Sequence, residues 1–361
     1  MSYHTETKLL LLVSTPFQYL SAIECVEQLF PGAQTLVVVA ADTNALSAVQ
    51  LTKLFKRFPP TKRIDVTLQH YGDIRERIAS YSSVLPQLNS KRFDAILIGD
   101  LRQNWMQDIA CSVDASEHIL LDDGAATLSI YDYLLKPTGC TLPIKLFHSS
   151  EQRQLEVAEI KQQLGFSIRP KTLKVFSVFD LEDATSRTNR FSLLKRELGC
   201  PSKLGRYWHF IGSPIVEKNL ASREEYEAVL LDALATQSQH GQAFYIAHRA
   251  EDMSGKATRL AEMGFTVISS EQPYELFLLQ QPDYPTSVSS FHSTCLFNLA
   301  VIFGNDITKI CYQLSEPALQ QLKQHFIMQN QYSVFQHIDS IYQRLAAFNI
   351  VARTLTLQES A

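Results

Sequence analysis

Three short segments of the chain combine residue types that could act together on a phosphorylated substrate. They are 120–124 (Leu-Leu-Asp-Asp-Gly), 245–249 (Tyr-Ile-Ala-His-Arg) and 291–297 (Phe-His-Ser-Thr-Cys-Leu-Phe), and each follows or ends an apolar run. A carboxylate can take a proton from an alcohol, whereas a histidine and a pair of hydroxyls can stabilise charge on a departing phosphate. The segments therefore indicate transfer of a group from a phosphate to a hydroxyl.

Asp122 and Asp123 directly follow the apolar residues 119–121, and Gly124 permits a tight turn after them. Neighbouring side chains at the end of a strand diverge, so one carboxylate can face a substrate while the other bonds to its own loop. The second negative charge raises the proton affinity of the first carboxylate, as a general base requires. Alternatively, the pair caps a helix starting at Ala125. A metal site would need further carboxylates, which the local sequence lacks.

His248 and Arg249 come directly after the apolar run 244–247. A histidine at a strand exit can donate a hydrogen bond to a phosphate or protonate a leaving group, and the arginine beside it could supply positive charge. The alternative is a purely structural loop histidine, which is the commoner case for an isolated residue.

Ser293 and Thr294 precede the apolar stretch 295–300, which suits a buried helix. Two hydroxyls and the free backbone N–H groups of a helix start can hold a phosphate, although simple capping by Ser293 is the commoner use. Glu275 is expected on the first turn of another helix. Its carboxylate could accept hydrogen bonds from both hydroxyls of a ribose, or only complement the helix dipole.

The elements that must position these residues follow from the hydropathy pattern, in which short apolar runs alternate with longer amphipathic ones. The expected strands are 9–13, 35–40, 64–68, 95–98, 118–121 and 172–178 in a first series, and 207–211, 243–247, 265–269, 287–289 and 308–311 in a second. This alternation is typical of parallel sheets linked by helices. We expect an α/β protein of two Rossmann-like, doubly wound domains facing a central cleft, with ligands at the carboxyl ends of the strands.

The domain boundaries expected from the composition are 1–190 for the first domain, 191–206 for a polar linker and 207–361 for the second. A length of 361 residues agrees with two domains. A helical pattern over 332–349 is expected to pack on a domain, with a return to the first domain as one option.

The overall composition excludes several classes of protein. With 33 basic and 37 acidic residues, the net charge of −4 provides no general attraction to nucleic acid. The six cysteines are widely spaced and have no histidine at zinc-ligand spacing, which is typical of reduced thiols in a cytoplasmic protein. The first residues lack the pattern of a signal peptide, and no stretch suits a membrane span, so we expect a soluble intracellular protein.

Taken in order, these motifs resemble a known family. Asp-Asp-Gly at 122–124, the strand-exit His248, Pro-Tyr-Glu-Leu at 273–276 and Ser-Thr-x-Leu-Phe at 293–297 are similar to the bacterial sialyltransferases of glycosyltransferase family 52 and the related capsule polysialyltransferases. Residues 12–18 resemble the opening strand and loop of that group, and 210–217 the first strand of its second domain. The resemblance rests on the ordered combination of these motifs.

The resemblance implies a GT-B fold, an N-terminal acceptor domain, a C-terminal domain that binds CMP-sialic acid, and inverting transfer without a metal or other cofactor. The roles that it implies are general base for Asp122, contact with the donor phosphate and proton donation for His248, ribose binding for Glu275, phosphate binding for Ser293 and Thr294, and a place along the donor site for Gly212 and Ser213. In that family a proline follows the histidine. Arg249 stands in its place here and is expected to relax the loop.

Two other classes of function remain open. One is a GT-B enzyme that uses a UDP-sugar, either a transferase or an epimerase, although no Gly-rich loop with adjacent Arg and Lys offers a diphosphate site. The other is a non-enzymatic two-domain sugar-binding protein, which the lack of a signal peptide argues against. The donor could also carry another nonulosonic acid.

The acceptor is expected to be a glycan such as lipopolysaccharide, lipooligosaccharide or capsule, which would bring the protein to the inner membrane peripherally. Candidate acceptor contacts lie in the loops of the first domain. They are Thr15, Pro16, Gln18, Arg102 and Trp105. Trp105 could stack on a sugar ring, or its side chain could be buried in the core.

Overall fold

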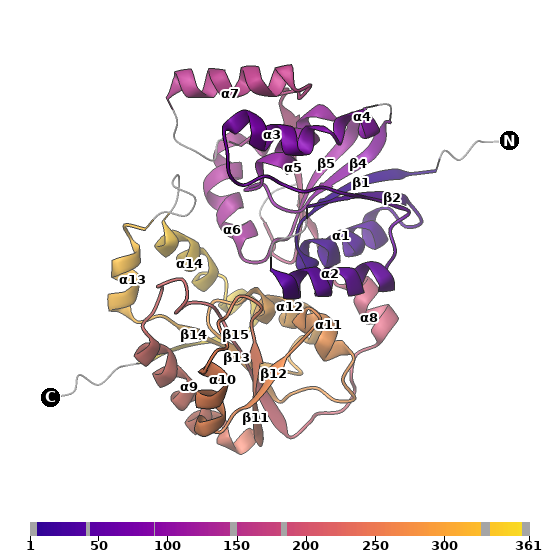
Figure 1. Ribbon diagram of the computed structural model, residues 1–361. Helices are drawn as coiled ribbons and strands as arrows, with labels where there is room; N and C mark the ends of the chain where they lie inside the picture. Colours follow the sequence, from indigo (N-terminus) through magenta and orange to yellow (C-terminus); the bar gives the residue numbers. More distant parts are fainter. Residues whose placement is uncertain are drawn as a thin grey trace. The chain divides into compact units, whose positions relative to one another are not determined.

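The computed structural model describes residues 6–40, 44–89, 91–144, 150–181, 186–325 and 333–355. Two compact units make up the chain, the first running to Leu193 and the second starting at Leu194 (Figure 1). The division falls inside the segment 191–206 that the sequence indicates as a linker. Part of this segment is helical, because α8 (Ser192–Leu198) occupies it.

The first unit contains a sheet of seven parallel strands in the order β3-β2-β1-β4-β5-β8-β9. Their bounds are β1 Lys8–Val13, β2 Gln34–Val39, β3 Lys62–Asp65, β4 Phe93–Ile98, β5 Ala115–Leu121, β8 Lys174–Ser177 and β9 Ser186–Thr188. The central strands are buried on both faces, which explains why residues 9–13 form an unbroken apolar run. The six strands expected in this unit are confirmed. The seventh, β9, was not expected, because its Ser-Arg-Thr sequence has no apolar residue.

Helices connect these strands and leave the carboxyl ends of the sheet to loops. They are α1 Pro16–Leu29, α2 Ala45–Arg57, α3 Ile74–Ser82, α4 Leu85–Leu88, α5 Asn104–Ser112, α6 Ala126–Ile130 and α7 Glu151–Gln163; a short antiparallel pair, β6 Thr141–Leu142 and β7 Lys171–Thr172, lies outside the main sheet. In contrast to α1, α7 has no buried residue and lies along the outside of the unit (Figure 1). The direction of winding reverses between β1 and β4, where doubly wound sheets bind ligands.

The second unit contains a sheet of six parallel strands in the order β12-β11-β10-β13-β14-β15. The strands are β10 Tyr207–Ile211, β11 Gln242–Ala247, β12 Thr266–Ser269, β13 Ser287–Ser290, β14 Thr308–Gln313 and β15 Ile350–Thr354, and the helices are α9 Arg223–Gln237, α10 Lys256–Met263, α11 Tyr274–Leu279, α12 Thr294–Phe303, α13 Glu316–Leu322 and α14 Val334–Tyr342. Five of these strands confirm the sequence pattern. The unexpected β15 is an edge strand, in which only Ile350 is buried.

The C-terminal helix α14 packs on the second unit. Ile338 belongs to its buried core, and the Tyr342 hydroxyl accepts a hydrogen bond from the backbone N–H of Leu314 at 2.9 Å. Each unit is thus a doubly wound α/β sheet, and the chain has the two Rossmann-like domains expected from its sequence.

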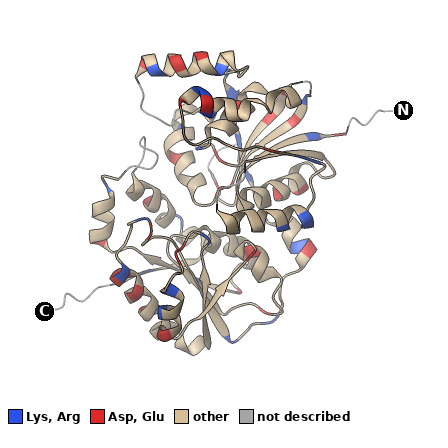
Figure 2. Cartoon of the chain, in the orientation of Figure 1, with Lys and Arg blue, Asp and Glu red and all other residues tan. Residues whose placement is uncertain are grey.

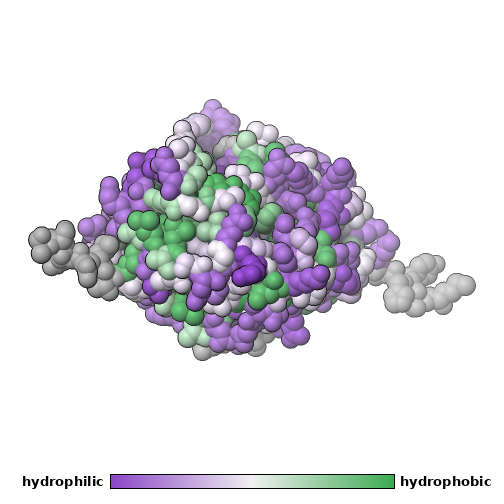
Figure 3. Space-filling model, turned by 90° about the horizontal axis from the view of Figure 1, so that it is seen from below, coloured by the Kyte–Doolittle hydropathy of each residue, from purple (hydrophilic) through white to green (hydrophobic). Residues whose placement is uncertain are grey.

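Basic and acidic residues are interspersed along the helices of each unit (Figure 2). In a view from below, hydrophobic residues form small areas among hydrophilic ones (Figure 3). Leu204, Leu231 and Val351 are the large hydrophobic side chains most exposed in the described part of the second unit. Within the described ranges, every helix is too short or too polar to cross a membrane.

Candidate functional site

Polar side chains that follow three strands, one of them on the first turn of α1, meet at the carboxyl edge of the first sheet. Gln18, Arg102 and Asp123 follow the adjacent strands β1, β4 and β5. The Gln18 amide donates to Asp123 Oδ1 at 3.0 Å, and the Arg102 guanidinium binds both Asp123 and Asp100, the latter at 2.9 Å. The structure therefore brings together three of the residues expected at this edge.

The other candidate acceptor residues of the first unit have structural roles. The Thr15 side chain caps α1 by accepting from the Gln18 backbone N–H at 3.2 Å, and Pro16 occupies the first turn of that helix. Trp105 is only 2% exposed. Its ring is therefore part of the core, which was one of the two expectations for this residue. It is not available to stack on a sugar, which was the other.

Asp122 lies beneath this polar surface and is 1% exposed. Its Oδ2 accepts from the backbone N–H of Val178 at 2.7 Å, while Oδ1 has no hydrogen-bond partner in the described part of the chain. Burial raises the pKa of Asp122 to about 7, against the opposing effect of hydrogen bonding by Ser177, Val178 and Thr127. Such a carboxyl gains and loses its proton near neutral pH. An acceptor hydroxyl can reach it only when the covering atoms move.

The two adjacent aspartates diverge as expected, but neither caps a helix. The helix α6 begins after Ala125 without a side-chain cap. The backbone N–H of Asp123 instead donates to the Thr127 hydroxyl at 3.0 Å. Gly124 has a φ of 72°, in the left-handed region that favours glycine. The turn after β5 thus separates a buried carboxylate from an ion-paired one.

In the second unit, His248 follows β11 and is held in one orientation. Its backbone N–H donates to Glu251 Oε2 at 2.7 Å, and its ring Nδ1 accepts from the Ala250 N–H at 3.1 Å. An accepting Nδ1 assigns the proton of the neutral ring to Nε2. Burial, followed by the charges of Arg249 and Lys218, lowers the pKa of His248 to about 4. The ring is therefore neutral at pH 7 and can donate a hydrogen bond through Nε2.

Positive charge gathers around the start of α12. Arg249 lowers the pKa of His248 and opposes the burial that raises the pKa of the Cys295 thiol on the first turn of α12. The pKa of His292 is lowered to about 4, mainly by burial and to a smaller extent by the charge of Lys218. Arg249 and Lys218 thus both act electrostatically on His248, and Lys218 also acts on His292. Together with the N-terminus of α12, they make a local environment that favours an anion.

His292 is a residue that the motif analysis passed over. It directly precedes Ser293, and its ring Nδ1 is buried without a hydrogen-bond partner among the described residues. A buried unpaired ring nitrogen is uncommon and is the kind of group that a ligand can satisfy. The sequence feature that could have indicated His292 is its position in the segment 291–297, between a strand and a helix.

Ser293 caps α12, which is the structural role considered for it from the sequence. Its Oγ accepts from the backbone N–H of Cys295 at 3.3 Å, and Thr294 is the first residue of the helix. Capping leaves the Ser293 hydroxyl proton available for donation to a second group. Both hydroxyls thus remain at the positive end of the helix.

Glu275 lies on the first turn of α11 and is 3% exposed. The Asn298 side-chain amide, on α12, donates to its Oε1 at 2.6 Å. In this arrangement the carboxylate connects α11 with α12. A ribose could bind to this carboxylate only after local rearrangement. The contacts of Glu275 therefore support its structural role, which is to join the two helices.

Gly212 and Ser213 follow β10 and contact the loop that carries His248. A Cβ at Gly212 would lie 2.1 Å from Glu251 Oε2 and 2.5 Å from the Tyr245 hydroxyl, so a side chain there would displace the glutamate. The Ser213 N–H donates to the Tyr226 hydroxyl at 3.4 Å. Glycine is thus required at position 212 for packing of Glu251, whatever binds nearby.

Glu251 itself was not recognised from the sequence, because it belongs to no motif. Its side chain is fully buried. It accepts from Lys256 Nζ at 2.5 Å and the Tyr245 hydroxyl at 2.6 Å, besides the His248 N–H. The Glu251 N–H in turn donates to the His248 carbonyl at 3.0 Å. The loop is therefore fixed without the proline whose replacement by Arg249 was expected to relax it.

Replacing Glu251 with alanine is expected to lower the free energy of unfolding by about 3–5 kcal/mol, because it removes the fully buried carboxylate 2.5 Å from the ammonium group of the largely buried Lys256. Urea denaturation followed by circular dichroism measures this change. Glu217 is the matched control, since it is 25% exposed and 3.7 Å from the same lysine Nζ. Its alanine variant should lose about 1 kcal/mol or less. Equal losses in the two variants would contradict the anchoring role of Glu251.

Within the described ranges, no three His, Cys, Asp or Glu side chains come together as metal ligands do. The chemistry that these two groups of residues can perform by themselves is proton removal near Asp122 and stabilisation of an anion near His248 and the start of α12.

Comparison with known proteins yields similarities of fold. No family model and no curated protein sequence matches the chain. Among solved structures, the Escherichia coli heptosyltransferase WaaC with ADP aligns over 95% of this chain and 99% of its own, with 13% identity and a TM-score of 0.42. UGT2 of Phytolacca americana, complexed with UDP-2-fluoro-glucose and pterostilbene, aligns over 98% and 86% with 12% identity and a TM-score of 0.47. UGT89C1 of Arabidopsis thaliana, complexed with UDP-L-rhamnose, aligns over 97% and 86% with 14% identity and a TM-score of 0.46.

Proposed function

We propose that this chain is an inverting glycosyltransferase that moves sialic acid, or a related nonulosonic acid, from a CMP-sugar to a hydroxyl of a glycan acceptor. The observation that carries the proposal is the anion-binding environment at the start of α12. There a neutral N–H donor on His248 and the charge of Arg249 follow β11, and the hydroxyls of Ser293 and Thr294 follow β13, at the same edge of the sheet with the end of β10 between them. Motif order adds the sugar class, through the resemblance to sialyltransferases.

A single phosphate suits this environment. It would accept hydrogen bonds from His248 Nε2 and from the hydroxyls, while the helix dipole and Arg249 balance its charge. In the proposed reaction the bond between the anomeric carbon and the phosphate oxygen breaks, and CMP leaves with the electron pair. Positive charge then develops on the sugar and negative charge on phosphate, so these groups stabilise the transition state more than the ground state.

Asp122 supplies the other half of the proposed step. The acceptor hydroxyl oxygen forms the new bond to the anomeric carbon on the face opposite the phosphate, and its proton passes to Asp122. A carboxyl whose pKa is about 7 accepts a proton more readily than an ordinary aspartate. Arg102 and Asp123, the latter held by the buried Gln18, offer polar contacts for the acceptor. No metal takes part in any of these steps as proposed.

The proposed acceptor is a surface glycan precursor, such as lipopolysaccharide, lipooligosaccharide or capsule. Attachment of that acceptor to lipid would hold the enzyme peripherally at the inner membrane.

We expect the purified protein to release CMP from CMP-sialic acid when a galactoside is present, and much less without it. A panel of galactosides and a chromatographic assay for CMP measure this reaction. Binding of CMP should also raise the melting temperature, by an amount that grows with ligand concentration. If UDP stabilises the protein and CMP does not, a UDP-sugar is the donor. If neither nucleotide binds and no CMP is released, the proposal of a nucleotide-sugar transferase is wrong.

A further inference from the structure

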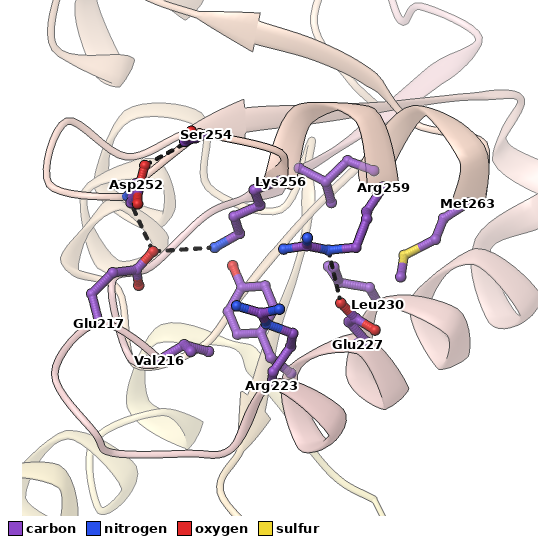
Figure 4. Close-up of a pocket in the computed structure, with 12 residues that line it drawn as sticks. Val216, Glu217, Arg223, Glu227, Leu230, Asp252, Ser254, Lys256, Arg259 and Met263 are labelled. Carbon is purple, nitrogen blue, oxygen red and sulfur yellow. Dashed lines mark hydrogen bonds and ion pairs between the residues drawn. The ribbon is translucent and has the colours of Figure 1, made fainter.

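A cavity of about 250 Å³ lies in the second unit between α9 and α10 (Figure 4). None of the residues assigned above to the donor lines it. Its apolar lining consists of Val216, Leu230, Leu260 and Met263. Small-molecule sites combine such an apolar lining with a few polar groups that fix orientation.

Three cationic side chains point into this cavity (Figure 4). Two have partners: Lys256 Nζ lies 2.5 Å from Glu251 Oε1, and Arg259 Nε lies 3.3 Å from Glu227 Oε1. The third, Arg223, is exposed at the first position of α9 and has no ion pair within the part of the chain that the structure describes. Its guanidinium is therefore available to a ligand.

The acidic lining residues are already engaged. Glu227 pairs with Arg259, and Glu217 accepts from the backbone N–H of Asp252 at 3.1 Å. Asp252 Oδ1 in turn accepts from the backbone N–H of Ser254 at 2.9 Å. Since Glu227 pairs with Arg259 and Glu217 also lies 3.7 Å from Lys256 Nζ, Arg223 is, among the described residues, the lining cation without an ion-pair partner and is the group that can bind an anion.

We propose that this cavity is a second binding site, for a small molecule that carries one anionic group on an apolar body. The anionic group binds Arg223 at the mouth, and the body packs against the apolar lining. The ammonium group of Lys256 lies 4.3 Å from the centre of the Tyr226 ring, so both side chains present a flat, partly apolar wall to the ligand.

Occupancy of the cavity is coupled to the loop of His248. Lys256 lines the cavity and binds Glu251, whose other carboxylate oxygen holds the His248 backbone N–H at 2.7 Å. A ligand that draws Lys256 toward the cavity weakens its contact with Glu251 and thereby changes the position of His248. By linkage, the ligand and the donor then change each other's affinity by the same factor. This consequence, unlike the binding itself, rests on the proposed function.

Three matched probes test the site by calorimetric titration of the full chain. They are 4-phenylbutyrate, which has the body and the charge, 4-phenylbutylamine, which has the same body and the opposite charge, and acetate, which has the charge alone. We expect the phenylbutyrate to bind at least tenfold more tightly than either control. Saturating CMP should leave a site for phenylbutyrate, because the two ligands occupy different places.

Arg223→Gln is expected to weaken phenylbutyrate binding about tenfold, the effect of one lost charged contact. The exposed Arg206, outside the cavity, gives the control variant Arg206→Gln, which should bind as the wild type does. Both substitutions are on the surface, so folding is not at issue. The His248 backbone amide resonance should shift during titration of the wild type and require about tenfold more probe in Arg223→Gln.

Equal binding of the amine or acetate, or binding unaffected by Arg223→Gln, would overturn the site. Binding with no response at His248 would overturn the coupling. Complete displacement of the probe by CMP would show that it binds at the nucleotide site, and would also overturn the proposal. Since these titrations need no catalysis, failure of the proposed transferase activity would appear separately, as absence of CMP release with normal phenylbutyrate binding.

Discussion

Asp122→Asn is expected to reduce transfer from CMP-sialic acid by about 10²–10⁴-fold, because the amide cannot accept the proton of the acceptor hydroxyl. Asparagine has nearly the shape of aspartate and can still accept the Val178 N–H bond that Asp122 Oδ2 now makes. Binding of CMP should therefore stay as in the wild type. Initial rates of CMP release and a CMP titration on the same preparation measure the two effects separately.

The same substitution should stabilise the protein at alkaline pH. The pKa of Asp122 is raised from an ordinary 3.8 to about 7 in the folded state, so the folded protein holds this proton more tightly than the unfolded chain. The stability contributed by this group is fully present below pH 4 and is lost as pH rises through about 7. The loss amounts to about 4 kcal/mol. At pH 8, Asp122→Asn should then have the higher free energy of unfolding, and at pH 4 the difference should vanish.

Asp123→Asn is the control for both measurements. Asp123 is bound by Gln18 and Arg102 and lies at the surface of the same turn, so its replacement should weaken acceptor binding more than the rate at saturation. If Asp123→Asn abolishes transfer while Asp122→Asn retains it, the base is Asp123 and the assignment of Asp122 is wrong.

The strands of both sheets could be predicted from the sequence because their signal is local. Residues 9–13 are all apolar since β1 is buried on both faces, and the same holds for much of β4. The two strands that were missed, β9 and β15, are edge strands: β9 has the polar sequence Ser-Arg-Thr, and in β15 only Ile350 is buried. Their place depends on pairing with a neighbour, which hydropathy does not record.

For the candidate site, the positions at strand exits could be predicted from the sequence, but the burial of each side chain could not. Asp122 and Asp123 are indistinguishable in the sequence, yet Asp122 is buried and Asp123 forms an ion pair with Arg102. Glu251 illustrates the same limit. It anchors His248 from three positions away through contacts with Tyr245 and Lys256, and such a constellation exists only once the strands and α10 are in place.

His248→Ala is expected to lower the rate of transfer by about 10²–10³-fold, the usual cost of removing one hydrogen-bond donor from a developing anion. Because Nδ1 accepts from Ala250, the donor is Nε2. His248→Gln is the informative companion, since its side-chain amide retains an N–H at similar reach. It should recover part of the lost rate, whereas a residue needed as an acid would give no recovery.

The pH dependence of transfer separates a hydrogen-bond donor from a proton donor. The pKa of His248 is lowered to about 4, mainly by burial, so the ring stays neutral from pH 5 upward. The rate, limited by ionisation of Asp122, should then rise up to pH 7 and level off, with no fall caused by the histidine. The profile of His248→Ala should have the same shape at a lower height. A descending limb with a midpoint near pH 6.5 in the wild type, lost in His248→Ala, would show instead that the imidazolium protonates the leaving group.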